Sequence, residues 1–348
     1  MNEKWYHRTG NMGETVISTR VRLARNLKGF PFPDRMSLDQ RNKVCQMVRD
    51  ALLCSNSAIR NDFDFIEMQS LSNVQAQALA ERHLISPEFA DNRQGKALLL
   101  KKDESVSIML CEEDHVRIQV MQPGLQLEEA YDLADKIDTL LDSQLHFAFD
   151  DRLGYLTQCP TNLGTGMRAS LMMHLPALEA TGVISELYKA VSKIGLVFRG
   201  LYGEGSKPKG AVYQLSNQIT LGISENDALQ NLSSIAGQVI GQEKEACGRL
   251  ERDMLEDRVY RSLGLLQSAR ILSAGEFMDL LSNLRWGLSL GMVEGVGFET
   301  VNSLLCDMQP ANLILHDAAA EDPAVRDRER AAAVRTALAH AGGKQDAP

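Results

Sequence analysis

The sequence predicts an α+β fold followed by an all-helical C-terminal domain. Residues 1–225 mix segments of strand-like alternation with segments of helical spacing, whereas residues 226–340 are helix-compatible almost throughout. A length of 348 residues suits two domains, and 44% hydrophobic residues can fill a sizeable core. We therefore divide the chain into residues 1–225, residues 226–340 and a flexible tail at residues 341–348.

Strand signals lie in the first of these domains. Residues 16–23 alternate, so that Val21 and Leu23 share one face while Arg20 and Arg22 share the other. Further strands are predicted at residues 106–110, 116–121 and 212–221. The strands at 106–110 and 116–121 pair around an acidic turn, because the residues between them read Cys-Glu-Glu-Asp-His.

Helical spacing of apolar residues occurs in both domains. It predicts helices at residues 125–141, 178–194 and 242–258. Ser273 and Glu276 have the spacing of a helix capping box, and Gly291 marks the end of the helix that follows. The boundary between the domains is expected at residues 223–227.

Charge and cysteine usage exclude several classes of protein. A net charge of −9 argues against a general binder of nucleic acid or of anionic membranes, so any phosphate chemistry must use a local arginine cluster. The six cysteines are scattered, without the spacing of a zinc site, which suits reduced thiols. The polar start lacks the apolar region of a signal peptide, and no apolar run is long enough for a membrane span. We expect a cytoplasmic protein.

Four segments combine arginine with glycine or with acid. The phosphate-binding loop G-x-x-x-x-G-K-[ST] and the H-R-D and D-F-G signatures of kinases are absent from the sequence. The four segments are STRVR at 18–22, CEEDHVRI at 111–118, CPTNLGTGMRAS at 159–170 and RGLYGEG at 199–205. Their arginines, which could hold a triphosphate through fixed planar donors, are Arg20, Arg22, Arg117, Arg168 and Arg199.

A cationic acceptor would need carboxylates beside that cradle. Glu113 and Glu204 are the best-placed candidates to bind a guanidinium group and to aim one nitrogen at the γ-phosphorus. One of them could take the proton, because a guanidinium has a pKa above about 12 and its nitrogen is a poor nucleophile while protonated. Cys159 precedes a proline and a turn, which places its sulfur at a strand end, where a thiolate could add a negative contact.

Each segment alone fits an ordinary structural interpretation. A lone arginine on a strand is usually solvated or paired at the surface, an acidic turn is usually a polar loop, and a lone cysteine is usually a small buried hydrophobe. Together and in this order, the four segments resemble the motif set of the phosphagen (guanidino) kinases, and CPTNLGTGMRAS is the most specific of them. The resemblance covers roughly residues 14–222.

The resemblance implies an antiparallel sheet flanked by helices and ATP as the phosphoryl donor. It makes Glu113 and Glu204 the carboxylates that orient and activate the guanidinium, Cys159 the thiol beside it, and His83 in ERHLISPEF a contact on the adenine side. The nucleotide site that it implies comprises Ser18, Thr19, Arg20, Val21, Arg22, His83, Arg117, Arg168, Ala169, Ser170, Leu171, Met172, Arg199, Gly200, Leu201, Tyr202 and Gly203. Residues 169–172 and 200–203 would contribute their backbone.

Departures from that pattern narrow the assignment. The first motif begins at Ser18, so the N-terminal domain that helps small-molecule guanidino kinases to close over their substrate is not seen, and the chain continues far beyond Glu204. This arrangement resembles the bacterial protein arginine kinases. A further departure is Lys207 and Lys209 beside the glutamate loop, which leaves the substrate range open.

A motif near the C-terminus supports the narrower resemblance. In those kinases an R-D-x-x-R-A pattern forms an allosteric pocket for phosphoarginine, and here it would comprise Arg326, Asp327, Arg330 and Ala331. Arg326 and Arg330 are four apart on a predicted helix and share a face, where they could grip a phosphoryl group while Asp327 holds the modified guanidinium. By composition alone the segment fits an ordinary charged helix.

We therefore expect a kinase that uses Mg²⁺ and ATP to phosphorylate arginine side chains of proteins. The magnesium would be held mainly through the nucleotide, since the sequence has no compact acidic metal motif. Two alternatives are a guanidino kinase that acts on free arginine and a catalytically inactive phosphoarginine-binding adaptor. The resemblance also implies a stress response in protein quality control, a zinc-binding activator protein and Clp-type proteases as partners, and a homodimer would suit the allosteric site.

Overall fold

An antiparallel sheet forms the centre of the molecule. The computed structural model describes residues 3–54, 59–200 and 209–343. The sheet has eight strands in the order β2-β3-β4-β5-β1-β8-β10-β9, and every neighbouring pair is antiparallel. Its strands are β1 (Val16–Arg25), β2 (Phe63–Glu67), β3 (Ala97–Lys101), β4 (Val106–Leu110), β5 (Val116–Pro123), β8 (Met167–His174), β9 (Leu196–Gly200) and β10 (Val212–Asn217). The predicted antiparallel sheet, including the β4–β5 pair around the acidic turn, is confirmed.

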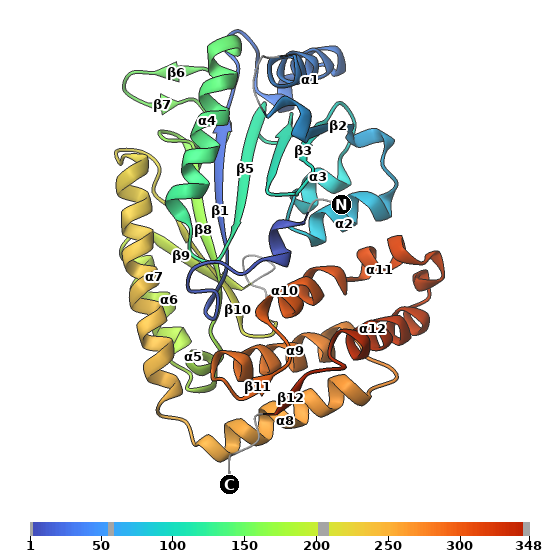
Figure 1. The fold of residues 1–348 in the computed structure, drawn as a ribbon. Coiled ribbons are helices and arrows are strands. Elements are labelled where there is room, and N and C mark those ends of the chain that lie inside the picture. Colours follow the sequence, from blue (N-terminus) through green and yellow to red (C-terminus); the bar gives the residue numbers. More distant parts are fainter. Residues whose placement is uncertain (1–2, 55–58, 201–208, 344–348) are drawn as a thin grey trace.

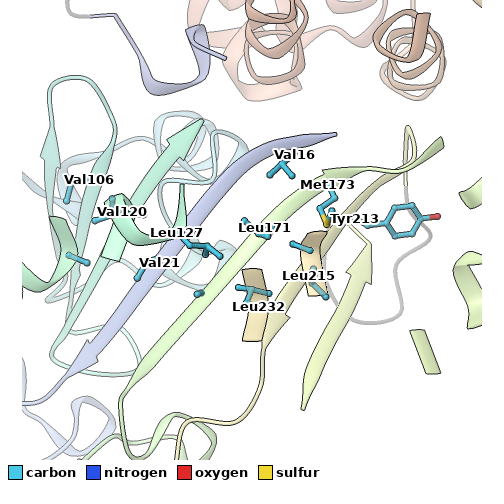
Figure 2. Packing of buried hydrophobic residues seen from close by; sticks show 14 of the residues in the cluster. Val16, Val21, Val106, Val120, Leu127, Leu171, Met173, Tyr213, Leu215 and Leu232 are labelled. Atoms are coloured by element: carbon cyan, nitrogen blue, oxygen red, sulfur yellow. The ribbon is translucent and has the colours of Figure 1, made fainter. Parts of the chain in front are cut away.

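Helices cover one face of this sheet. They are α1 (Leu38–Leu53), α4 (Leu127–Leu145), α5 (Pro176–Ala180), α6 (Ile184–Ser192) and α7 (Glu225–Cys247). Helix α4 packs on β1 and β5, α7 packs on β8 and β10, and α1 packs on α4 (Figure 1). The side chains between these helices and the sheet belong to one buried cluster, which continues into residues beyond 250. Val21, Leu171 and Leu232 are among its members labelled in Figure 2.

Alternation along the strands divides the sheet into an apolar face and a polar face. On β1, Thr19 and Val21 are fully buried, whereas Arg20 and Arg22 are only partly buried. Residues directly opposite each other on antiparallel strands point to the same face, so the register of β1 with β5 and β8 continues this division across the centre of the sheet. The polar face holds the candidate site described below.

The remaining helices lie at one edge and one end of the sheet. Helices α2 (Asn73–Glu81) and α3 (Pro87–Asp91) flank the edge near β2 and β3. The C-terminal part forms the helical lower portion in Figure 1 and comprises α8 (Arg252–Ser268), α9 (Ala274–Ser289), α10 (Phe298–Asp307), α11 (Pro310–His316) and α12 (Pro323–Ala337). Short 3-10 helices are η1 (Trp5–His7), η2 (Pro33–Arg35), η3 (Arg60–Asp62), η4 (Met68–Ser70), η5 (Pro160–Asn162) and η6 (Ala318–Glu321).

Two pairs of very short strands complete the described structure. β6 (Phe149–Asp150) pairs with β7 (Gly154–Tyr155), and β11 (Val293–Glu294) pairs with β12 (Gly342–Gly343). A flexible tail was expected from residue 341, but Gly342 and Gly343 are paired with β11 in this short ladder. Residues 344–348 lie outside the described residues.

Three predicted elements differ from the structure. The helix expected at 178–194 is two helices, α5 and α6, separated at Gly182, whose φ of 73° no regular helix accommodates. The charged helix expected at 242–258 spans the end of α7 and the start of α8, with a break that begins at the poor helix former Gly248. The strand expected at 212–221 ends at Asn217, whose side chain bonds the backbone of residues 167, 169 and 219.

Helix α7 bears on the division into domains. The division predicted at residues 225/226 coincides with the first residue of α7, but the buried side of this helix, with Leu232 and Val239, belongs to the core beneath the sheet. This packing favours a division after α7, in the turn before α8.

The prediction that Ser273 caps the next helix is confirmed, since its hydroxyl accepts the Glu276 N–H at the start of α9.

The described structure has neither a disulfide bond nor a helix that could span a membrane. All six cysteines are free thiols. Within residues 3–54, 59–200 and 209–343, no helix combines the length and the apolar character needed to cross a bilayer.

Candidate active site

Two adjoining cavities lie on the polar face of the sheet. The larger has a volume of about 870 Å³ and the smaller about 260 Å³. Both are lined by Arg22, Glu113, Arg117 and Arg199, which therefore form a shared wall. The structure thus brings together residues from three of the four segments singled out in the sequence, and the fourth contributes Cys159 and Arg168 to the smaller cavity.

The strand register places the arginines in one group. Arg22 on β1 lies directly opposite Arg168 on β8, and Arg20 lies opposite Ser170, to whose hydroxyl its Nε donates over 3.3 Å. Like charges opposite each other on neighbouring strands destabilise a sheet. The arrangement therefore costs stability in the protein alone and favours an anionic ligand that bridges the strands.

Burial and neighbouring arginines lower the pKa values of three of these residues, Arg20, Arg22 and Arg168. Burial, with Arg117 nearby, lowers the pKa of Arg20 to about 10. Burial also lowers the pKa of Arg22, aided by Arg20, Arg117 and Arg168, and burial together with Arg199 lowers that of Arg168. Arg22 Nε is buried and has no hydrogen-bond partner among the described residues. A polyanion here would supply the missing acceptors and reduce the repulsion.

The acidic turn at 111–115 brings carboxylates to the same wall. Cys111 has a φ of 58°, in the left-handed region, and its N–H bonds the His115 carbonyl, so the chain turns sharply at the end of β4. Arg117 then bridges two carboxylates, with Nη1 at 2.6 Å from Glu112 and Nη2 at 2.9 Å from Glu113. Glu113 remains 35% exposed, so it is accessible from the smaller cavity.

The other two residues of this turn anchor it. Asp114 is fully buried and accepts hydrogen bonds from Asn26 Nδ2 at 2.6 Å and from the Gln158 N–H at 2.8 Å. The His115 ring accepts the Leu27 N–H through Nδ1 and lies 2.8 Å from the Pro31 carbonyl through Nε2. Desolvation raises the pKa of Asp114 and lowers that of His115. These hydrogen bonds of Asp114 and His115 therefore fix the backbone that carries Glu112 and Glu113.

The segment around Cys159 forms the far side of the smaller cavity. Cys159 precedes η5 rather than ending a strand, and its sulfur lies 3.1 Å from the Thr161 hydroxyl. Asn162 Nδ2 donates to Glu113 over 3.3 Å while Arg168 Nε donates to Asn162 Oδ1 over 3.1 Å. Asn162 thereby links an acidic and a basic residue of the site.

Asn162 and Glu112 are site residues that the sequence reasoning missed. Asn162 lies in the most specific of the four segments, so that segment was the available signal. Glu112 lies next to the chosen Glu113, and only the hairpin geometry shows that both carboxylates bind Arg117. Ser86 also donates to Glu112, over 2.7 Å.

His83 lines the larger cavity but not the smaller one. It follows α2, has a φ of 60°, and lines the cavity together with Met172 and Gln309. Burial, with Arg20 nearby, lowers the pKa of His83 to about 4, so the ring is neutral at pH 7. A neutral imidazole beside an apolar methionine suits an uncharged heteroaromatic group better than a phosphate.

Some predicted nucleotide-site residues do not reach either cavity with their side chains. Thr19, Val21, Ala169 and Leu171 are fully buried on the opposite face of the sheet, because side chains along a strand alternate. Gly200 is the last residue of β9 and is buried. Leu201, Tyr202, Gly203 and the predicted carboxylate Glu204 lie outside the described residues, as does Lys207.

The R-D-x-x-R-A segment lies on α12, and its residues are not among those that line the two cavities. The open face predicted for Arg326 and Arg330 differs from the structure, since Arg330 is 0% exposed and Ala331 is fully buried. Arg330 donates to the Met308 and Leu272 carbonyls and to Asp327, while Arg326 donates to the Ala320 carbonyl. Arg330 therefore joins three parts of the C-terminal region, and its guanidinium is directed inward.

Metal ligands are not gathered in the described part of the chain. There, no group of three or more His, Cys, Asp and Glu side chains is arranged to hold a metal ion. The acids nearest the arginines are instead paired with Arg117.

Known proteins resemble both parts of the chain. The family described as ATP:guanido phosphotransferase, C-terminal catalytic domain, matches residues 43–246, and the family described as Protein-arginine kinase McsB C-terminal domain matches residues 252–348. The turn between α7 and α8 separates the two matches.

Similar sequences cover nearly the whole chain. The protein-arginine kinase of Caldanaerobacter subterraneus subsp. tengcongensis is 45% identical over 93% of this chain and 97% of its own. That of Moorella thermoacetica is 45% identical over 97% of this chain and 98% of its own.

Solved structures share the fold. Lombricine kinase superimposes with a TM-score of 0.61 at 22% identity, covering 72% of this chain and 75% of its own. The duplicated taurocyamine kinase from Schistosoma mansoni, bound to components of a transition-state analog, gives a TM-score of 0.61 at 25% identity, covering 77% of this chain and 40% of its own.

Proposed function

The chain belongs to the ATP:guanido phosphotransferase family, and we propose that it is a protein-arginine kinase, which transfers the γ-phosphoryl group of ATP to arginine side chains of proteins. The relatives that carry this name match the sheet and the C-terminal helices alike. Their similarity supports the acceptor, and the site supports the reaction type.

The wall shared by the two cavities is the observation that carries this proposal. A ligand in the larger cavity and a ligand in the smaller one would meet at Arg22, Glu113, Arg117 and Arg199. The larger cavity offers a neutral ring as well as arginines, which suits a nucleotide with its phosphates at the wall. The smaller cavity offers Glu113 and Cys159, which suit a guanidinium group.

The reaction follows from this placement. A guanidinium nitrogen attacks the γ-phosphorus, an N–P bond forms, and the bond from phosphorus to the bridging oxygen of ADP breaks, while the nitrogen loses one proton. Arginines fixed on β1, β5, β8 and β9 stabilise the charge that develops on the transferred oxygens, because they need no rearrangement at that moment. In this proposal Glu113, which is partly exposed to the smaller cavity, binds the acceptor and takes the proton.

Asn162 and the anchored turn fix the position of the Glu113 side chain relative to the arginines that would bind the phosphates. Asn162 and Arg117 both donate to the Glu113 carboxylate, Arg168 in turn donates to Asn162, and Asp114 ties the turn to residue 158. Glu204 and the backbone of residues 201–203 complete the site in this proposal, as the second carboxylate and as part of the nucleotide pocket. Mg²⁺ would enter with ATP, held mainly by the phosphates, and would neutralise part of their charge.

The regulatory setting is part of the proposal as well. Phosphoarginine binding by Arg326, Asp327, Arg330 and Ala331 would require the guanidinium of Arg330 to leave its carbonyl partners. The zinc-binding activator, the Clp-type protease and the homodimer are supported by the resemblance alone, whereas the cytoplasmic location is an expectation from the polar N-terminal segment and the scattered cysteines. The six free thiols are compatible with that location.

The acceptor can be tested directly. The purified protein is incubated with Mg²⁺, ATP and a bacterial lysate, and acid-labile phosphate is mapped by mass spectrometry, with free L-arginine assayed in parallel. We expect phosphate on arginine side chains of proteins. Phosphorylation of the free amino acid alone would replace the proposal with a small-molecule guanidino kinase, and phosphate confined to serine, threonine or histidine would refute it.

A matched pair of variants completes this test. Glu113→Gln keeps the shape of the side chain but removes its charge, so turnover should fall by roughly 100-fold or more. Glu128→Gln removes the same charge from an exposed position on the first turn of α4 and should leave turnover unchanged. Equal activities of the two variants would contradict the role assigned to Glu113.

A further inference from the structure

We propose that Glu81 is a positioning residue that fixes the adenine-side wall of the larger cavity by holding the C-terminal helix α11 against α2. The inference rests on the proposed function, since it takes the larger cavity as the nucleotide site. It adds that the C-terminal region is a structural part of this site. Neither the sequence motifs nor the four segments around the arginines point to Glu81.

Glu81 is the last residue of α2, and its carboxylate binds the first turn of α11. The Ala311 N–H lies 3.0 Å from Oε1 and 2.9 Å from Oε2, and Asn312 donates to Oε2 through its N–H at 3.2 Å and its Nδ2 at 3.1 Å. Helix α11 begins at Pro310, so these backbone N–H groups have no acceptor within their own helix. A carboxylate 230 residues earlier in the chain therefore caps this helix.

The residues beside this contact line the cavity. His83 follows Glu81 by two residues, and Gln309 precedes Ala311 by two residues. Both side chains, and Glu81 itself, line the larger cavity at the end where Met172 lies. The two walls at this end thus come from opposite parts of the chain, where α2 packs on α11, and the Glu81 carboxylate supplies hydrogen bonds between these two helices.

Each wall is also fixed to its own part of the molecule. The His83 and Leu84 carbonyls accept hydrogen bonds from Gln119 Nε2 on β5, at 2.8 and 3.2 Å. Gln309 Nε2 donates to the Leu305 carbonyl over 2.8 Å and lies 3.7 Å from Met278 Sδ on α9. Because each wall is anchored separately, loss of the carboxylate would change their spacing without detaching either one.

This geometry separates adenosine binding from phosphate binding. The arginines lie on β1, β5, β8 and β9, and the Glu81 contact involves none of these strands. When only part of the population has a binding-competent wall, the apparent dissociation constant equals the intrinsic constant divided by that fraction, whereas a saturated site turns over normally. Weakening the contact should therefore affect ligands that contain adenosine and spare the phosphates alone.

Isothermal titration calorimetry with ADP and with pyrophosphate tests this, because the two ligands differ by the adenosine. For Glu81→Gln we expect the dissociation constant of ADP to rise about tenfold, the loss typical of charge-assisted hydrogen bonds, while that of pyrophosphate stays within about twofold. The KM for ATP should rise to a similar extent, with kcat within about twofold of the wild-type value. Glu128→Gln is the matched control on α4.

A second variant covers the case in which Glu81→Gln folds poorly. Gln309→Ala leaves the Glu81 carboxylate and its four hydrogen bonds intact and removes one side chain from the wall. It should weaken ADP binding by about threefold and leave pyrophosphate binding unchanged. Equal losses for both ligands, or ADP binding unchanged in both variants, would overturn the inference. A wild-type protein that binds neither ligand would overturn the proposed function and the inference with it.

Discussion

Buried arginines serve two purposes in this molecule, and the difference lies in where their donors point. In the C-terminal region, Arg330 donates to the Met308 and Leu272 carbonyls, and Arg285 donates to the Gly13 and Glu14 carbonyls. On the sheet, Arg22 faces another arginine and a cavity. The first group joins segments of the chain, whereas the second group is assembled for a ligand.

Burial and pKa alone do not separate the two groups. Burial lowers the pKa of Arg285 to about 9, and burial lowers the pKa of Arg20 to about 10. The neighbours differ, because Arg20 and Arg22 are destabilised further by other arginines, whereas Glu14 favours the charged form of Arg285. A cluster of cations that oppose one another is therefore a better sign of an anion site than a single buried cation.

The largest effect is expected on the sheet, from Arg22→Gln. Loss of this guanidinium should lower kcat/KM by roughly 10³-fold, the scale found for arginines that stabilise a phosphoryl-transfer transition state. The melting temperature should stay the same or rise, because one of the opposing charges is gone. Steady-state kinetics and thermal unfolding of one preparation measure both. A large fall in melting temperature would place Arg22 among the structural arginines.

Arg330→Met should show the reverse pattern. Removing the guanidinium leaves two buried carbonyls and Asp327 without their partner, which should lower the free energy of unfolding by about 3 kcal/mol. The kcat/KM measured at 20 °C, where the variant is still folded, should remain within about threefold of the wild type. Urea unfolding gives the first quantity. Unchanged stability, together with lost stimulation by phosphoarginine, would instead favour the predicted allosteric pocket.

The smallest effect is expected from Asn162→Ala, which lies between the two cases. Asn162 brings no charge to the phosphates but connects Glu113 to Arg168 on β8. Its removal should lower kcat by about tenfold and leave the KM for ATP nearly unchanged, because it positions the acceptor carboxylate rather than the nucleotide. Initial rates at varied ATP concentration measure the two constants. A rise in the KM for ATP without a change in kcat would assign Asn162 to the nucleotide.

Local pattern predicted the sheet and the arginine group well. Alternation in residues 16–23 places Arg20 and Arg22 on one face, and the structure has them there. The same alternation explains why Thr19 and Val21, taken over from the motif as a block, face the core instead. The helix breaks at Gly182 and Gly248 were missed, because the periodicity of apolar residues does not reveal where a helix ends and another begins.

Contacts between distant segments could not be predicted from one sequence. Arg330 looked like half of an open pair at helical spacing, but its partners, Leu272 and Met308, lie on other segments of the C-terminal region. Glu81 meets α11 across 230 residues, and Asn162 meets Glu113 across 49. Each of these roles depends on tertiary packing. The sequence offers no signal for Arg330 or Glu81 in these roles, and for Asn162 it offers only the place of this residue in the most specific segment.

The register of β1 also limits how this chain can change during evolution. Its pairing with β8 shifts between Val16 and Ser18 and is regular from Ser18 to Leu23, the stretch that carries both arginines. One inserted or deleted residue inside that stretch would move Arg20 and Arg22 into the apolar core and bring Thr19 and Val21 to the cavity. Insertions and deletions among related chains should therefore be found outside β1, and within β1 related chains should differ by substitutions only.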